Sequence, residues 1–266
     1  MSDPRGPVVV VTRDERVDDG FSRALTALGA RPVSLQTIRV EPAEDLVPLD
    51  AALDVMDSFD WVVFTSANGV DATCSRAAWR TAWARPLRPR IAAVGPVTKA
   101  HLDARALPVA VTPARASAVD LMAALEASGA KLNGARVLWP RSEIARRDLF
   151  EALTKAGASL VAPVAYRTVA VAPPGLATFC RDLETGRVDA VAFLSPSSAR
   201  ALAKAMPTGT LSWLAGRAIV ASIGPSTTAM LKALGAPPDV EPRERSAASL
   251  ADAICAALTS RRGIRA

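Results

Sequence analysis

The sequence has few of the residues on which common catalytic and metal sites depend. His101 is the only histidine, which argues against Ser-His-Asp catalysis and against multi-histidine metal sites. The three cysteines, Cys74, Cys180 and Cys255, are odd in number, far apart and outside any C-x-x-C motif. We therefore expect neither a disulfide framework nor a metal site, and the chemistry of the chain must use other groups.

The sequence also lacks a long apolar run. None approaches the roughly 18 residues that a membrane helix requires, and residues 1–5 lack the hydrophobic stretch of a signal peptide. Half of the residues are hydrophobic and 22% are charged, a composition that argues against intrinsic disorder. We expect a soluble, cytoplasmic protein without a membrane partner.

Lysine is scarce as well: 5 lysines stand against 27 arginines, and the formal net charge is +6. This excess suits an anionic partner, because a guanidinium can bind a carboxylate or phosphate through two parallel hydrogen bonds. The arginines are scattered, and neither a helix-turn-helix nor an RNP-like aromatic motif accompanies them, which argues against nucleic acid. A polyanionic small molecule fits the composition equally well.

What the sequence does contain is an internal repeat. Residues 60–66 (Asp-Trp-Val-Val-Phe-Thr-Ser) match 189–195 (Asp-Ala-Val-Ala-Phe-Leu-Ser), and 94–98 match 223–227 through a shared Gly-Pro-x-Thr, all at an offset of 129 residues. A repeat of this length is right for a domain and too long for a solenoid unit. The 266 residues are therefore interpreted as two duplicated domains.

Short β-branched runs alternate with amphipathic stretches in each repeat, which is the pattern of a parallel sheet flanked by helices. A helix is predicted after the first strand, because Phe21, Leu25 and Leu28 recur at helical spacing and Gly29 supplies a stop. The strands are predicted at 8–12, 61–65, 91–94, 136–139, 190–194 and 219–223. We predict doubly wound α/β domains, whose ligands bind beyond the carboxyl ends of the strands.

Polar motifs follow those strand ends. Ser66 and Ser195 each come directly after a strand, where a hydroxyl can cap the next helix. Thr98 and Thr227 each stand in a Gly-Pro-x-Thr motif that begins a helix. The free amides at a helix N-terminus attract anions, so four such ends could hold several carboxylates or phosphates. Two interpretations stay open here, ordinary helix caps or a shared anion-binding site.

The strings at 63–68, 94–98, 166–168, 193–197 and 223–227, in this order and spacing, resemble the uroporphyrinogen-III synthase family. The resemblance covers essentially the whole chain. It implies a bilobed protein of two similar flavodoxin-like domains joined by a two-stranded β hinge. It further implies a hydro-lyase that cyclises hydroxymethylbilane to uroporphyrinogen III, losing water and inverting ring D, with no metal or organic cofactor.

The resemblance also revises the domain boundaries. A tandem duplication would cut the chain near its middle, whereas members of this family exchange elements between lobes. Carried over, the first lobe is 1–38 plus 170–266 and the second is 41–165. Strands at 37–41 and 164–169 would form the hinge.

Tyr166, the only tyrosine, falls in that hinge, where the family carries the tyrosine that assists departure of the hydroxyl. We predict that it acts as hydrogen-bond donor or general acid; the alternative is a half-buried tyrosine with its hydroxyl in water. In the family, serines line the cleft and threonines contact the substrate. We expect arginines at or just after strand ends to bind carboxylates of the substrate; the alternative is that they are solvated surface residues. The predicted substrate-binding residues are Arg13, Ser66, Thr98, Arg141, Arg147, Ser195, Ser197 and Thr227.

The implied substrate fits the composition, because hydroxymethylbilane carries eight carboxylates and the chain is rich in arginine. Two other classes stay open: a non-catalytic two-lobe protein that binds a polyanion and releases it unchanged, and a nucleic-acid module. We expect a monomer, with transient contact to hydroxymethylbilane synthase as a possible partner interaction.

Overall fold

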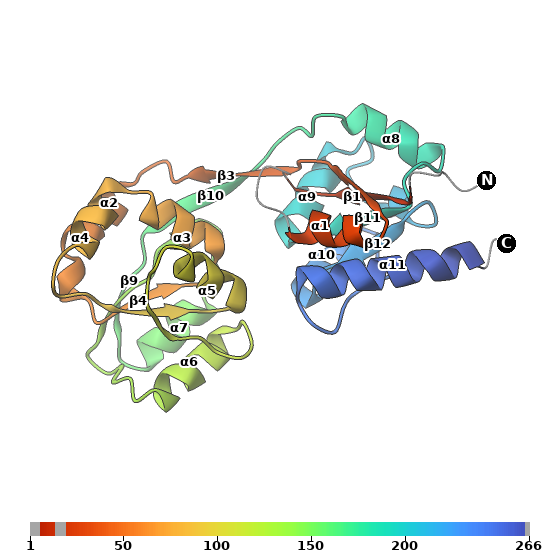
Figure 1. Cartoon of the computed structure of the whole chain (residues 1–266). Coiled ribbons are helices and arrows are strands. Elements are labelled where there is room, and N and C mark those ends of the chain that lie inside the picture. Colours follow the sequence, from red (N-terminus) through yellow and green to blue (C-terminus); the bar gives the residue numbers. More distant parts are fainter. Residues whose placement is uncertain (1–5, 14–19, 264–266) are drawn as a thin grey trace. The chain divides into compact units, whose positions relative to one another are not determined.

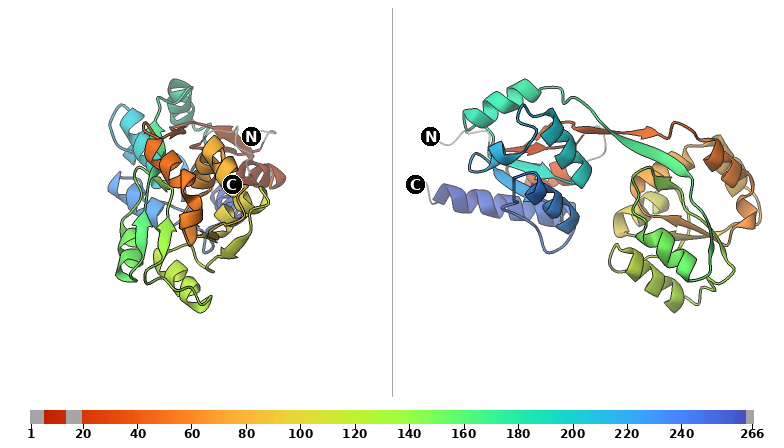
Figure 2. Two further views of the ribbon diagram at one scale, coloured as in Figure 1. Left: turned by 90° about the vertical axis from the view of Figure 1, so that its left-hand side faces the viewer. Right: turned by 180° about the vertical axis from the view of Figure 1, so that it is seen from behind.

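The computed structural model describes residues 6–13 and 20–263. The chain forms two compact units: unit 1 combines Met1–Arg39 with Val169–Ala266, and unit 2 is Val40–Thr168. Each unit has its own parallel sheet with helices on both faces (Figures 1 and 2). The folded unit is therefore not the tandem repeat of the sequence, because unit 1 takes its first strands from the N-terminal segment.

The sheet of unit 1 has the strand order β12-β11-β1-β2, and every neighbouring pair is parallel. Its strands are β1 (Val8–Val11), β2 (Arg31–Ser34), β11 (Ala190–Phe193) and β12 (Ile219–Ser222). Its helices are α1 (Gly20–Ala27), α8 (Leu176–Glu184), α9 (Pro196–Ala205), α10 (Pro225–Ala233) and α11 (Ala247–Gly263). β1, β11 and β12 are buried along their whole length, as continuous apolar runs in a parallel sheet should be.

Side chains from alternate strand positions build one core on each face of this sheet. Val10, Val191 and Phe193 pack under α8, α9 and α10. Val9 and Val11 pack on the other face, where α1 and α11 lie side by side (Figure 1). Each fully buried side chain of this size stabilises the fold by about 1.5–3 kcal/mol.

The sheet of unit 2 has the order β6-β5-β4-β7-β9 and is also parallel throughout. Its strands are β4 (Trp61–Phe64), β5 (Arg90–Ala93), β6 (Val109–Val111), β7 (Arg136–Leu138) and β9 (Ser159–Val161). Its helices are α2 (Val47–Asp54), α3 (Ala67–Cys74), α4 (Ala77–Trp83), α5 (Pro96–Asp103), α6 (Ala118–Ala127) and α7 (Asp148–Lys155). Short 3-10 turns at Met56–Ser58 and Ser212–Leu214 complete the elements of the two units.

The two sheets follow one scheme. β4 and β5 of unit 2 correspond to β11 and β12 of unit 1, and β7 and β9 correspond to β1 and β2. The isolated parallel bridge between Ala221 and Val240 stands where unit 2 has the pairing of Ala92 with Val111. The predicted doubly wound, duplicated α/β fold is confirmed, and each of the six predicted strands is present with bounds shifted by at most one residue.

A separate small sheet, in the order β3-β10-β8, contains the two strands that pass from one unit to the other. These are β3 (Ile38–Pro42) and β10 (Val164–Ala170), at the segments where the hinge is expected. The sheet has a third strand that the sequence analysis did not predict, β8 (Arg141–Ser142), which pairs in parallel with β10. The backbone of β8 joins this small sheet through a hydrogen bond in which the Arg141 N–H donates to the Pro163 carbonyl oxygen at 3.0 Å.

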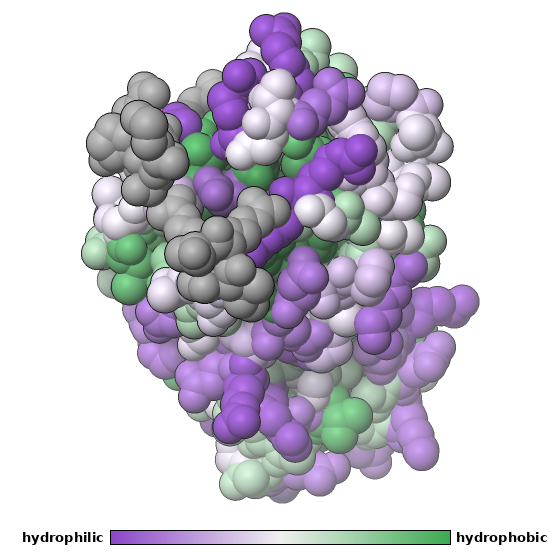
Figure 3. Space-filling model, turned by 90° about the vertical axis from the view of Figure 1, so that its right-hand side faces the viewer, coloured by the Kyte–Doolittle hydropathy of each residue, from purple (hydrophilic) through white to green (hydrophobic). Residues whose placement is uncertain are grey.

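Figure 3 shows a face on which hydrophilic and hydrophobic residues are mixed, with hydrophilic residues over much of its lower part. Within the residues that the structure describes, no helix combines the length and the apolar character needed to cross a membrane.

Candidate active site at the carboxyl ends of the strands

Ser66 and Tyr166 meet at the carboxyl end of the unit 2 sheet. Ser66 directly follows β4 and caps α3, where its Oγ accepts a hydrogen bond from the Gly69 N–H at 3.0 Å. The Tyr166 hydroxyl lies 2.8 Å from the same Oγ, although the two residues are 100 positions apart. Tyr166 is only 7% exposed, so it is buried rather than half-buried and its hydroxyl has a protein partner.

The strand β10 and the short strand β8 fix the position of Tyr166. Tyr166 is in register with Ser142, and its carbonyl accepts a hydrogen bond from the Glu143 N–H at 3.0 Å. The start of α3 also packs closely here, because a Cβ at Gly69 would lie 3.3 Å from Ser66 Oγ and 3.8 Å from Tyr166 Cε1. A glycine at this position therefore avoids a tight contact with Ser66 Oγ, the atom that contacts the Tyr166 hydroxyl.

Ser195 is the unit 1 counterpart of Ser66. It caps α9, and its Oγ accepts a hydrogen bond from the Ser198 N–H at 3.1 Å. Ser198 is buried, with its Oγ 3.1 Å from the Thr12 hydroxyl. Ser197 is half-buried in the first turn of α9. The predicted serines of unit 1 thus occupy the same strand end as Ser66 does in unit 2.

Thr98 and Thr227 lie in the first turns of α5 and α10, which follow the equivalent strands β5 and β12. Gly95 and Gly224 are the residues before these helices, and a proline opens each first turn. The two threonines are 5% and 1% exposed within the chain as it stands. A substrate could therefore contact only the small exposed part of each threonine side chain. The substrate-binding role of Thr98 and Thr227 stays a prediction.

The three predicted arginines differ in their surroundings. Arg141 is held by the backbone, because its Nε donates to the Ala162 carbonyl at 3.1 Å and its Nη1 to the carbonyls of Ser142 and Glu143. Arg147 is exposed at the start of α7. Arg13 follows β1 in unit 1, and burial lowers the pKa of its guanidinium from the ordinary value.

Two sets of paired side chains in the chain were missed by the sequence analysis. Arg167, the neighbour of Tyr166 on β10, donates to the carboxylates of Glu41 at 3.0 Å and Glu44 and thereby ties β10 to the chain around β3. Asp71 on α3 pairs with Arg105, just after α5, at 2.8 Å and contacts Nδ1 of His101 in α5 at 3.2 Å. Both sets join residues that are far apart in sequence, and no local pattern identifies them.

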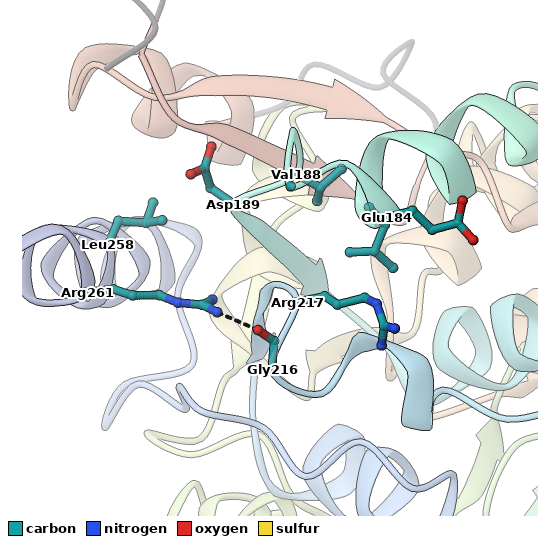
Figure 4. Close-up of a pocket in the computed structure, with 9 residues that line it drawn as sticks. Glu184, Val188, Asp189, Gly216, Arg217, Leu258 and Arg261 are labelled. Atoms are coloured by element: carbon teal, nitrogen blue, oxygen red, sulfur yellow. Dashed lines mark hydrogen bonds between the residues drawn. The ribbon is translucent and has the colours of Figure 1, made fainter. Parts of the chain in front are cut away.

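A cavity of about 210 Å³ lies at the opposite, amino end of the unit 1 strands (Figure 4). It is bordered by acidic Glu184 and Asp189 and by basic Arg217 and Arg261, and Arg261 Nη2 donates to the Gly216 carbonyl at 2.8 Å. None of the predicted site residues lines it. No group of three His, Cys, Asp or Glu side chains in the described part of the chain could hold a metal ion.

Duplicated doubly wound units, with hydroxyl caps and arginines at the carboxyl ends of parallel strands, define a two-unit α/β protein with anion-attracting groups where ligands of such sheets bind. The family model described as uroporphyrinogen-III synthase HemD matches residues 19–252, and the chain belongs to this family. The resemblance seen in the sequence motifs is therefore confirmed, and nothing favours the non-catalytic alternative.

Individual relatives agree with the family. The uroporphyrinogen-III synthase of Synechococcus elongatus is 29% identical over 245 residues, covering 90% of each chain. That of Chlorobaculum parvum is 28% identical over 258 residues, covering 94% of this chain and 98% of its own. A mutant uroporphyrinogen III synthase of Thermus thermophilus has a similar structure, with a TM-score of 0.63 at 17% identity over 96% of this chain and all of its own. This last likeness supports the fold.

Proposed function

We propose that the Tyr166–Ser66 pair is the chemical centre of the uroporphyrinogen-III synthase activity of this chain. The chain is an enzyme of tetrapyrrole biosynthesis that cyclises hydroxymethylbilane, a linear tetrapyrrole, with loss of water and inversion of ring D. The observation that supports the pair is the 2.8 Å contact between the two hydroxyls at the carboxyl end of the unit 2 sheet, where ligands of such sheets bind.

The reaction needs a proton donor for its first step. The bond between the hydroxymethyl carbon and its oxygen breaks, the electron pair leaves with the oxygen, and the oxygen takes up a proton and departs as water. The electron-rich pyrrole supplies electrons to the former hydroxymethyl carbon, which is electron-deficient once its oxygen has left. To invert ring D, the carbon of ring D that carries its existing bridge bonds to this carbon, and the old bond to the bridge breaks. The freed bridge carbon then bonds to the other α-position of ring D, and the proton lost from that position restores the donor.

The hydrogen bonds around Ser66 suit Tyr166 to this role. Ser66 Oγ accepts from the Gly69 N–H, so its own hydrogen can be donated to the Tyr166 oxygen. In that arrangement the phenol proton of Tyr166 is left for the departing hydroxyl. The same Ser66 donor would stabilise the negative charge that develops on the phenol oxygen as its proton leaves.

We assign substrate binding to the residues at the strand ends, whose guanidinium and hydroxyl groups can hydrogen-bond the eight carboxylates of hydroxymethylbilane. Charge-assisted hydrogen bonds contribute about 1.5–3 kcal/mol each, so a few of them give useful affinity after side-chain ordering. The residues are Arg13, Ser66, Thr98, Arg141, Arg147, Ser195, Ser197 and Thr227.

The direct test uses the purified chain and freshly generated hydroxymethylbilane. The products are oxidised, and the I and III isomers of the porphyrin are resolved by chromatography. Formation of the III isomer in proportion to enzyme concentration is the expected result. Recovery of the I isomer alone would contradict the activity.

We also propose that the chain works in the cytoplasm as a monomer, that it binds no nucleic acid, and that it meets hydroxymethylbilane synthase only transiently. The scattered arginines and the absence of a nucleic-acid motif in the sequence support the part of this proposal that concerns nucleic acid. The molar mass measured by light scattering, as the protein elutes from a sizing column, tests whether it is a monomer. A gel shift on random DNA at several salt concentrations tests nucleic-acid binding.

A further inference from the structure

A second cavity, of about 330 Å³, lies in unit 2 between the segments that follow β7 and β9. It therefore opens at the carboxyl end of the same sheet that carries Ser66. Three of its lining residues are arginines and the others are apolar. The lining consists of Trp139, Arg141, Ala145, Arg146, Arg147, Phe150 and Ala162.

The three arginines give this cavity a strong preference for anions. Three of the described hydrogen bonds hold Arg141 Nε and Nη1, and none of them uses its Nη2. The Arg146 side chain is 81% exposed, and its Nε is 3.4 Å from an Asp148 carboxylate oxygen. One aspartate offsets only part of the charge of three guanidinium groups, so a bound carboxylate would relieve their mutual repulsion.

The apolar part of the lining suits a flat ring. Trp139 belongs to the buried core of unit 2, and Ala162 follows β9. Phe150 is 38% exposed, whereas Leu149 and Leu153 form the buried face of α7. An aromatic side chain at the mouth of a basic cavity offers a stacking surface for a ring that carries carboxylates.

The cavity is also next to Tyr166 along the small sheet. Arg141 is the residue before Ser142, which is in register with Tyr166, and the Glu143 N–H donates to the Tyr166 carbonyl. A ligand held by the arginines would therefore lie close to the residue that we assign to the chemistry.

We propose that this cavity is a carboxylate subsite that binds one pyrrole ring of hydroxymethylbilane, with Arg146 and Arg147 on the carboxylates and Phe150 against the ring. The inference rests on the proposed function, and it adds Arg146 and Phe150 as specificity-determining residues. Arg141 shapes the wall of the subsite, where its contacts with three backbone carbonyls fix its guanidinium.

The test compares two double variants that each remove two exposed positive charges. Arg146→Gln with Arg147→Gln changes the subsite. Arg181→Gln with Arg187→Gln is the control, because both arginines are exposed in unit 1 before the amino end of β11, and Arg187 pairs with Asp182. Thermal unfolding of both proteins confirms that they are folded.

We measure KM and kcat for hydroxymethylbilane and, without turnover, the Kd for uroporphyrinogen III under anaerobic conditions. The subsite variant should raise KM and Kd about 10- to 100-fold, the loss expected from charge-assisted hydrogen bonds, with kcat changed much less. Added salt should raise KM less steeply for this variant than for the wild type. The control should change KM and Kd less than about twofold.

The outcomes separate the subsite from the proposed function. A wild-type enzyme that makes the III isomer, together with an unchanged KM and Kd in the subsite variant, would overturn the subsite and leave the function standing. A wild-type protein that makes no III isomer would overturn the function, and the Kd comparison would still decide whether the cavity binds the octacarboxylate.

Phe150→Ala provides a second measurement with no change of charge. Loss of the ring contact should raise KM about 3- to 10-fold, a range that follows from the strength of aromatic pairs. The salt dependence of KM should stay that of the wild type, because no ionic contact is lost. A wild-type KM for Phe150→Ala would remove Phe150 from the subsite.

Discussion

Units 1 and 2 share a sheet and a capping serine but differ in what surrounds that serine. Ser195 and Ser66 cap equivalent helices by the same contact, a hydrogen bond from the backbone N–H three residues later. In unit 1 that residue is Ser198, which is buried beside Thr12. In unit 2 it is Gly69, which leaves space beside Ser66 Oγ, and that oxygen contacts the Tyr166 hydroxyl. The capping hydrogen bond that both units share stabilises the fold. We assign the chemistry to the Tyr166 hydroxyl, which has no counterpart beside Ser195 among the described residues.

Tyr166→Phe removes the hydroxyl that distinguishes the surroundings of Ser66 from those of Ser195. Of the variants considered, it should have the largest effect on activity. Loss of the phenol hydroxyl deletes the proposed proton donor, so kcat should fall about 10²–10⁴-fold, the range of general acid contributions. The melting temperature should change little, because the ring stays packed in the core of unit 2. Steady-state kinetics and a thermal melt measure the two quantities. A full cyclisation rate at an unchanged melting temperature would show that the assignment is wrong.

The matched variants Ser66→Ala and Ser195→Ala sharpen the comparison. Each loses one helix cap, so each should lower the free energy of unfolding by about 0.5–2 kcal/mol in urea titrations. Only Ser66→Ala also removes the partner of Tyr166, and we expect its kcat to fall about tenfold, as the loss of one hydrogen bond to a developing charge predicts. Equal kcat values for the two variants would mean that the Ser66–Tyr166 contact is purely structural.

Gly69→Ala and Ser198→Ala place the same side chain, alanine, at the two equivalent residues whose N–H groups donate to Ser66 and Ser195. The new Cβ at position 69 would lie 3.3 Å from Ser66 Oγ and 3.4 Å from the Pro140 carbonyl, so these groups must shift by a few tenths of an ångström. Such a shift of a positioned donor should lower kcat about 3- to 10-fold. Ser198→Ala should leave kcat unchanged and lower stability by about 1 kcal/mol, because a buried hydroxyl contact is lost. The reverse pattern would contradict the division of roles between the units.

The comparison also explains which parts of the molecule could be predicted from the sequence. The runs Val8–Val11, Trp61–Phe64 and Ala190–Phe193 are fully buried strands, and their continuous apolar character predicted them. β2 and β9 were missed because they are short and partly exposed at one edge of each sheet, where the apolar signal is weak.

The candidate site was less predictable than the fold. The repeat placed Ser66 and Ser195 at equivalent strand ends, which local sequence is sufficient to show. The contact between Ser66 and Tyr166 depends on β10 returning beside β8, which brings together residues 100 positions apart that no local pattern connects. Only the resemblance in motif order singled out Tyr166. The backbone contacts of Arg141 could not be predicted, because they depend on the two-residue strand β8.

The helix pairs beside the sheets show one further difference between the units. In unit 2, Asp50 of α2 accepts hydrogen bonds from Arg76, with Arg76 Nε 2.9 Å and Nη2 2.5 Å from its two oxygens. At the positions 129 residues later, unit 1 has Phe179, which is buried, and Ala205. The ion pair of unit 2 is therefore replaced by two apolar residues at the corresponding positions of unit 1.

Acid should weaken the Asp50–Arg76 contact of unit 2, which the corresponding positions of unit 1 lack. The hydrogen bond from Arg76 lowers the pKa of Asp50, so its contribution is present above the ordinary aspartate pKa and is lost as pH falls through the lowered value. The pair is partly exposed and is expected to contribute about 0.2–1 kcal/mol, the smallest effect considered. Arg76→Gln should return the pKa of Asp50, followed by carboxyl NMR, toward its ordinary value and reduce the pH dependence of unfolding below about pH 4. An Asp50 pKa that does not change in this variant would mean that Arg76 is not the cause of the lowered value.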